Sequence, residues 1–241
     1  MAQLLPRQAW GFGMWSLMGL ALLAAAIEPA FAHGIGGKDA AFVAATKEAD
    51  ILPFMYLGAK HMFTGYDHLL FLLGVIFFLY RMRDIAIYVT LFSIGHSITL
   101  LAGVLMEINV SAYLVDAIIG LSVVYKAFDN LNGFKTLFGW QPNNKVAVGL
   151  FGLIHGFGLA TKLQALNLNE NGLVINMIGF NIGVELGQIF ALSIILALMV
   201  LWRRTSSFNR LATATNVAIM VAGFVLMEIQ LAGYFMGLPV V

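Results

Sequence analysis

Long apolar segments, separated by short polar stretches, dominate the chain after residue 64. A helix needs about 20 mostly apolar residues to cross a bilayer, and six segments approach or exceed that length. We expect them near residues 66–82, 84–104, 110–127, 145–163, 173–202 and 211–237. The polar stretches "DNLNGFKTLFGWQPNN" and "QALNLNENG" are rich in Asn and Gly, which is typical of loops. The pattern predicts an all-α, polytopic membrane helix bundle of about six transmembrane helices after an N-terminal signal segment.

The N-terminus resembles a cleaved export signal. Arg7 precedes the apolar stretch "GFGMWSLMGLALLAAAI", and Ala30 and Ala32 form the small-x-small pattern of a signal-peptidase site. Cleavage would leave His33 as the first residue, and the alternative is an uncleaved first helix. We therefore expect a signal peptide at 1–32, a periplasmic or interfacial segment at 33–63 containing an amphipathic surface helix, and a transmembrane bundle at 64–241.

Composition supports the membrane assignment and excludes other classes. The chain is 61% hydrophobic and 10% charged, whereas soluble domains are roughly 45–50% apolar and about 25% charged. A net charge of +1 gives no reason to expect a nucleic-acid partner. The absence of cysteine excludes disulfides and thiolate metal ligands.

Basic residues occur in alternate connections between the expected spans, and such residues mark cytoplasmic loops. This asymmetry predicts a multi-pass protein of the bacterial inner membrane, with the mature N- and C-termini in the periplasm. The residues concerned are Arg81, Arg83, Lys126, Lys135, Lys145, Arg203, Arg204 and Arg210.

Ionisable residues inside membrane spans are costly and indicate function by default. Here they share one sign pattern, histidines with carboxylates, and a similar depth in the half of the bilayer expected to face outwards. Such carboxylates require protonation, hydrogen bonding or a cation, and no lysine or arginine is expected deep in a span. The candidate metal ligands are His61, Asp67, His68, His96, His155 and Glu185, and the candidate supporting residues are His33, Ser97, Asp116, Asn181, Gln188 and Glu228.

Helix geometry limits how these residues combine. On a continuous helix His61 and His68 would lie about 10 Å apart, so either the chain bends at Gly65 or His61 does not contact the ion. Asp67 and His68 differ by about 100° around a helix, so one is expected to bind the ion while the other caps or orients it. Imidazole with carboxylate suits zinc, nickel, copper or iron(II).

Less specific interpretations stay open for single residues. Asp67 can cap a helix, His96 can bond a carbonyl group, and Asn181 and Gln188 can join helices. Glu228 can extend its carboxylate to the outer surface. The Gly152-x-x-x-Gly156 spacing is typical of close helix contact and would place the intervening helical face against a neighbour.

Four ordered blocks, "GAKHMFTGYDHLLFLL", "LFSIGHSITL", "LFGLIHGFGLA" and "GFNIGVELGQ", resemble the HupE/UreJ family of membrane proteins over about residues 57–195. The resemblance implies a signal peptide, about six membrane helices, and nickel or cobalt supply for hydrogenase and urease, with a membrane or metalloenzyme complex as partner. It points to His61, Asp67, His68, His96, His155 and Glu185. Asp116 stands where the family's third-span block is expected to carry Glu.

Three functions remain as alternatives. The first is transport or supply of a divalent ion (nickel, cobalt or zinc) captured at a periplasmic site, although the inner halves of the spans show no polar exit. The second is an intramembrane metal-dependent hydrolase in which Asp67 or Glu185 acts as general base on metal-activated water. The third is a non-enzymatic accessory subunit. Enzyme activity is left open, and the balance favours a non-enzymatic role.

Overall fold

The structure is a computed structural model that describes residues 37–165 and 169–237. The described residues form helices and no strands, so the all-α prediction is confirmed for them. The predicted signal peptide 1–32 and His33 lie outside the described residues. The helices are α2 (Gly37–Ala45), α3 (Ile51–Thr64), α4 (Tyr66–Ile76), α5 (Met82–Leu105), α6 (Ala112–Asn130), α7 (Gly133–Phe138), α8 (Asn144–Gln164), α9 (Leu173–Arg203) and α10 (Ser206–Met236).

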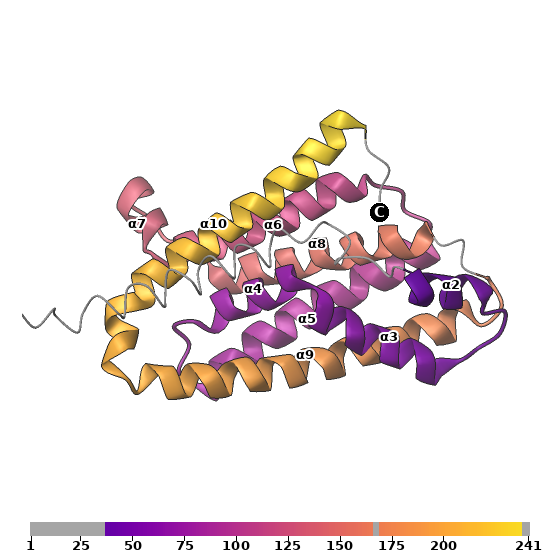
Figure 1. Ribbon diagram of the computed structural model, residues 1–241, viewed down its shortest axis with the longest axis horizontal. Helices are drawn as coiled ribbons and strands as arrows, with labels where there is room; N and C mark the ends of the chain where they lie inside the picture. The colour runs from indigo at the N-terminus through magenta and orange to yellow at the C-terminus, as the bar shows by residue number, and fades with distance from the viewer. Residues whose placement is uncertain (1–36, 166–168, 238–241) are drawn as a thin grey trace, which may run out of the picture.

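The helices form an elongated bundle in which α5 and α8 lie between α9 on one side and the α6–α10 pair on the other (Figure 1). Four of the described helices, α5, α8, α9 and α10, are long and apolar enough to cross a membrane. These four identify a multi-pass membrane protein. The expected count of six spans is not confirmed, because α4 has only 11 residues and α6 carries Asp116, Lys126 and Asp129 within its 19 residues.

The first expected span, 66–82, is the clearest departure from prediction. The helix begins at Tyr66 but ends at Ile76, where Arg203 of α9 donates to the Ile76 and Phe77 carbonyl groups. On its other side, Gly65 has an extended backbone (φ −78°, ψ 90°) that separates α4 from α3. Two short helices joined at Gly65 therefore stand where one long helix was expected.

Helix α3 packs lengthwise on α9. A Cβ on Gly58 would overlap the Phe180 carbonyl oxygen, and a Cβ on Gly183 would overlap that of Met55. Such close backbone approach is what small residues permit between membrane helices. The residues predicted to be interfacial thus include a helix held against the bundle. The predicted division at residue 63 stays a prediction, and α3 ends at Thr64.

Close approach also joins α5 to α8, which run parallel. A Cβ on Gly152 would overlap the Phe92 carbonyl oxygen, and one on Gly156 would overlap the His96 carbonyl oxygen. The Gly152-x-x-x-Gly156 face therefore makes the helix contact that its spacing predicted. The contact holds His96 and His155 on adjacent helices at the same level of the bundle.

The basic residues on which the predicted orientation rests gather at one end of the bundle, called the basic end below. There α4, α6 and α9 end, while α5, α8 and α10 begin (Figure 1). This agrees with the alternation of charge on which the predicted orientation rests, and the orientation itself stays a prediction.

Candidate metal centre

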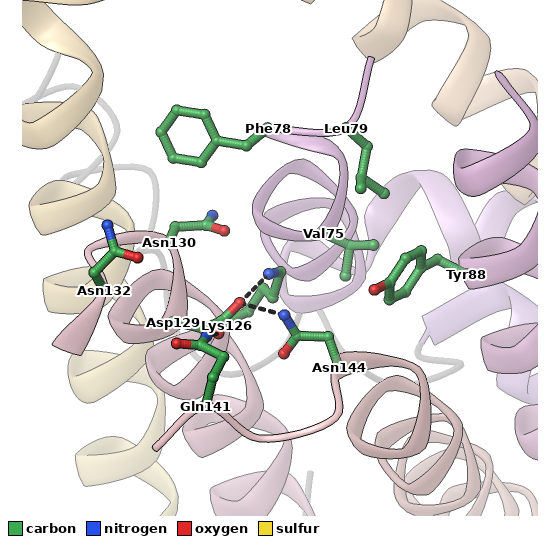
Figure 2. A pocket seen from close by; sticks show the side chains of 10 residues that line it. All are labelled: Val75, Phe78, Leu79, Tyr88, Lys126, Asp129, Asn130, Asn132, Gln141 and Asn144. Carbon is green, nitrogen blue, oxygen red and sulfur yellow. Dashed lines mark hydrogen bonds and ion pairs between the residues drawn. The ribbon is translucent and has the colours of Figure 1, made fainter. Parts of the chain in front are cut away.

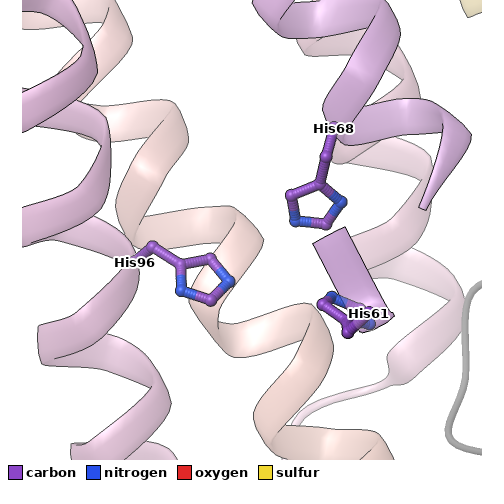
Figure 3. A group of neighbouring side chains, drawn as sticks. All are labelled: His61, His68 and His96. Carbon is purple, nitrogen blue, oxygen red and sulfur yellow. The ribbon is translucent and has the colours of Figure 1, made fainter. Parts of the chain in front are cut away.

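Three histidines from three helices converge in the interior. His61 lies in the last turn of α3, His68 in the first turn of α4, and His96 in α5 (Figure 3). The break at Gly65 turns α4 back towards α3, so the His61 and His68 ring centroids are 5.1 Å apart. The His68 and His96 rings are 5.9 Å apart. The chain therefore takes the bent alternative that brings His61 into the cluster.

The three rings present unsatisfied nitrogens to one another. One nitrogen from each ring lies within 4.8 Å of the other two. The side chains are buried, and His61 Nε2, His68 Nε2 and both ring nitrogens of His96 have no hydrogen-bond partner among the described residues. A buried polar atom without a partner costs about 1–3 kcal/mol. We therefore expect a further interaction with these nitrogens that offsets this cost.

A divalent transition-metal ion fits this arrangement. Imidazole nitrogen suits zinc, nickel, copper and iron, and bonds near 2.1 Å place neighbouring ligand nitrogens about 3–3.5 Å apart. The described nitrogens, within 4.8 Å of one another, would need shifts of about 1 Å to reach that spacing. Within the described part of the chain, the three histidines are thus the residues best placed to hold an ion.

Asp67 orients one of these histidines. Its Oδ1 lies 2.8 Å from His68 Nδ1 and accepts the backbone N–H of His68 at 2.8 Å. When Nδ1 donates to the carboxylate, Nε2 is left as the lone-pair nitrogen that faces the cluster. Asp67 is therefore placed to orient the His68 ring, and the predicted division of roles between the two residues stays a prediction.

Replacing this carboxylate tests its orienting role. Asp67→Ala is expected to lower the affinity for a divalent transition-metal ion by about 10–100-fold, which is typical when the hydrogen-bond partner of a metal-bound histidine is removed. Asp67→Asn keeps an acceptor for Nδ1 and should lose less. Isothermal titration of the purified protein measures both, and Asp84→Ala, in the first turn of α5, is the control. Equal affinity in Asp67→Ala and Asp84→Ala would exclude the role.

His155 lies beside the three histidines. Its ring centroid is 4.9 Å from that of His68, and its Nε2 lies 3.0 Å from Ser122 Oγ of α6. It does not belong to the group whose nitrogens all lie within 4.8 Å of one another in the described part of the chain. The structure thus places His155 next to the cluster, with α6 holding its ring.

The comparison with known families is decisive. Residues 37–237 match the family model described as HupE / UreJ protein. The chain belongs to the HupE/UreJ family. The match spans every described helix from α2 to α10, so both the histidine cluster and the helices around it lie inside the HupE/UreJ region. No curated protein and no solved structure matches the chain.

In this HupE/UreJ protein the predicted polar face of α9 contacts α5. Ser97 Oγ donates to Glu185 Oε1 at 3.2 Å and accepts from Asn181 Nδ2 at 2.9 Å. One turn away, Ser93 Oγ donates to Gln188 Oε1 at 2.8 Å. Asn181 and Gln188 thus join two helices, as the less specific interpretation expected. Glu185 lies outside the group of three histidine nitrogens in the described residues, and its part as a ligand stays a prediction.

Asp116 has a cationic partner that the sequence interpretation did not expect. Lys162, near the end of α8, places its Nζ 2.8 Å from Asp116 Oδ2, and both side chains are buried. Lys162 lies in the last turn of α8, so this cation comes from the end of a span, and the expected absence of a cation deep in the spans stays a prediction. Glu228 is exposed on α10, and the predicted extension of its carboxylate to the outer surface stays a prediction.

Sequence reasoning also missed the aromatic surroundings of the histidines. Phe92 lies one helical turn before His96, and its ring centroid is 5.0 Å from that of His155. Phe71 lies 5.3 Å from the His155 ring and 5.3 Å from Phe92. Phenylalanine at helical spacing is typical of ordinary packing, so only the positions of the neighbouring helices indicate that these rings border the cluster.

Proposed function

We propose that the chain binds a divalent transition-metal ion, nickel or cobalt, at His61, His68 and His96 and takes part in its transport or supply. The observation that carries the proposal is the convergence of three buried imidazoles whose facing nitrogens lack hydrogen-bond partners within the described residues. Nickel and cobalt follow from membership of the HupE/UreJ family, whose resemblance implies their supply to hydrogenase and urease. Asp67 orients His68, and Glu185 is a candidate further ligand.

The position of the cluster favours a translocated ion over a structural one. His96 lies well inside α5, and His61 and His68 lie beside the junction of α3 and α4. All three are therefore away from both ends of the bundle. Sites near the middle of the bilayer, formed by interrupted helices, are typical of secondary transporters. A periplasmic entrance at the end opposite the basic end and a bacterial inner-membrane location belong to the same proposal.

The hydrolase alternative has less support. Glu185, one candidate general base in that alternative, accepts a hydrogen bond from Ser97 and lies outside the group of three histidine nitrogens in the described residues. An accessory role without transport stays a prediction, and nickel flux separates it from the proposal.

Nickel uptake by proteoliposomes tests the proposed function. We expect saturable uptake by the wild-type protein and at least a tenfold lower initial rate in His68→Ala, because one of three imidazole ligands is gone. Ser193→Ala, an exposed position on α9, should transport as the wild type does. Uptake that is unchanged in His68→Ala, or no uptake by a wild-type protein that binds nickel, would contradict transport through this site.

A further inference from the structure

A polar pocket of about 390 Å³ lies at the basic end (Figure 2). It lies where the end of α4 meets the start of α5, the end of α6 and the start of α8. Its lining residues are Val75, Phe78, Leu79, Tyr88, Lys126, Asp129, Asn130, Asn132, Gln141 and Asn144.

A buried carboxylate is the chemical centre of the pocket. Asp129 Oδ2 accepts from Lys126 Nζ at 2.5 Å and from Asn144 Nδ2 at 2.8 Å, and Asp129 Oδ1 accepts from Gln141. Lys126 and Asp129 are each 6% exposed. Asn144 Oδ1 is buried without a hydrogen-bond partner in the described residues. Carboxylate and amide oxygens bind divalent ions more weakly than three imidazoles bind nickel, which suits a position from which an ion is released.

The helices carry the same order of residues from the histidines to the pocket. Along α4, α5 and α8, a histidine is followed towards the basic end by a phenylalanine one turn away and then by a pocket residue. Residues three, four or seven apart share one helix face. On each helix, the histidine, the phenylalanine and the pocket residue therefore lie on the same face. The series are His68, Phe71 and Val75; His96, Phe92 and Tyr88; and His155, Phe151 and Asn144.

The three phenylalanines form a continuous layer between the two polar regions. The Phe71 ring centroid is 5.3 Å from that of Phe92 and 5.8 Å from that of Phe151. Phe71 and Phe92 are 0% and 1% exposed. Hydrophobic constrictions of this kind exclude water and hydrated ions when closed.

We propose that the pocket around Asp129 is a second binding position for the divalent ion, and that the layer of Phe71, Phe92 and Phe151 is the closed barrier between it and the histidine site. This inference rests on the proposed transport function. It supplies the exit that the apolar sequence of the inner half-spans did not show. The Lys126 ammonium group forms an ion pair with the Asp129 carboxylate, and an arriving divalent ion displaces this ammonium group.

Two substitutions away from the histidines test the inference. Asp129→Asn should lower nickel flux into proteoliposomes by at least fivefold while nickel affinity at the histidine site changes by less than about twofold. Phe151→Ala should change flux by at least threefold, because it opens the layer without removing a ring that contacts a histidine. The controls are Asp84→Asn, at the same end of the bundle, and Leu150→Ala, an exposed neighbour of Phe151.

A thiol measurement provides a second test that does not depend on transport. The chain has no cysteine, so Leu79→Cys, at a partly exposed position of the pocket, and Leu72→Cys, at a buried position nearer the barrier, each introduce one thiol. A water-soluble maleimide should label Leu79→Cys and leave Leu72→Cys unmodified in the folded protein. Absence of labelling at Leu79→Cys would overturn the pocket as a water-accessible position.

The outcomes separate the two proposals. If the wild-type protein carries nickel while Asp129→Asn and Phe151→Ala match their controls, the inner position is overturned and the histidine site stands. If the wild-type protein binds nickel but carries none, the transport function fails and the exit path fails with it. Reduced flux with unchanged affinity in Asp129→Asn supports both.

Discussion

His96→Phe is expected to lower the nickel affinity of the purified protein by at least about a hundredfold while leaving the metal-free protein as stable as the wild type. The loss is expected to match or exceed the 10–100-fold that removal of an outer partner of a metal ligand costs. The metal-free protein loses no hydrogen bond, because both His96 nitrogens lack partners among the described residues. The phenyl ring is slightly larger than the imidazole and fills its buried space, so no cavity forms.

Equilibrium dialysis with nickel and thermal unfolding without metal, on the same preparation, give the two readouts. Ser122→Ala is the control, since Ser122 contacts His155 and not the three convergent rings. A His96→Phe protein that binds nickel as the wild type does would exclude His96 as a ligand. A protein that unfolds at much lower temperature without metal would show that His96 has a structural role instead.

Lys162→Met is expected to lower the free energy of unfolding by about 3–5 kcal/mol, which is typical when one partner of a buried ion pair is removed. The Asp116 and Lys162 side chains are 8% and 9% exposed and their charged atoms are 2.8 Å apart. The substitution leaves the Asp116 carboxylate buried without this cation. Thermal unfolding in detergent measures the change.

The double variant Asp116→Leu with Lys162→Met should recover more than half of that loss, because an apolar pair replaces an unpaired charge. Lys145→Met, at an exposed position on the same helix, is the matched control. Equal unfolding temperatures for Lys162→Met and Lys145→Met would show that the pair contributes nothing to stability.

Sequence periodicity predicted the long helices well and the short ones poorly. Helices α5, α8, α9 and α10 follow uninterrupted apolar runs, so composition alone indicates them. The first expected span failed because apolar character continues past Ile76, whereas the helix does not. The sequence left open whether the chain bends at Gly65. The hydrophobic pattern cannot decide this, because a bent and a straight chain have the same apolar residues.

The candidate site shows the same division. Similar depth in separate helices indicated that His68 and His96 would lie near each other. Which nitrogens converge depends on helix rotation and on the turn at Gly65, and neither can be read from the sequence. The sequence placed Lys162 at the end of a span, where the structure also has it. Its ion pair with Asp116 was missed, because the helix that a long side chain reaches depends on how the helices pack.

The central claim is that His61, His68 and His96 together hold a divalent metal ion, and nickel-edge X-ray absorption of the nickel-loaded protein tests it most directly. We predict the multiple-scattering signal of imidazole ligands in the nickel-loaded protein, reduced in His96→Phe. A nickel environment made only of oxygen ligands, or the same imidazole signal in His96→Phe as in the wild type, would contradict the claim.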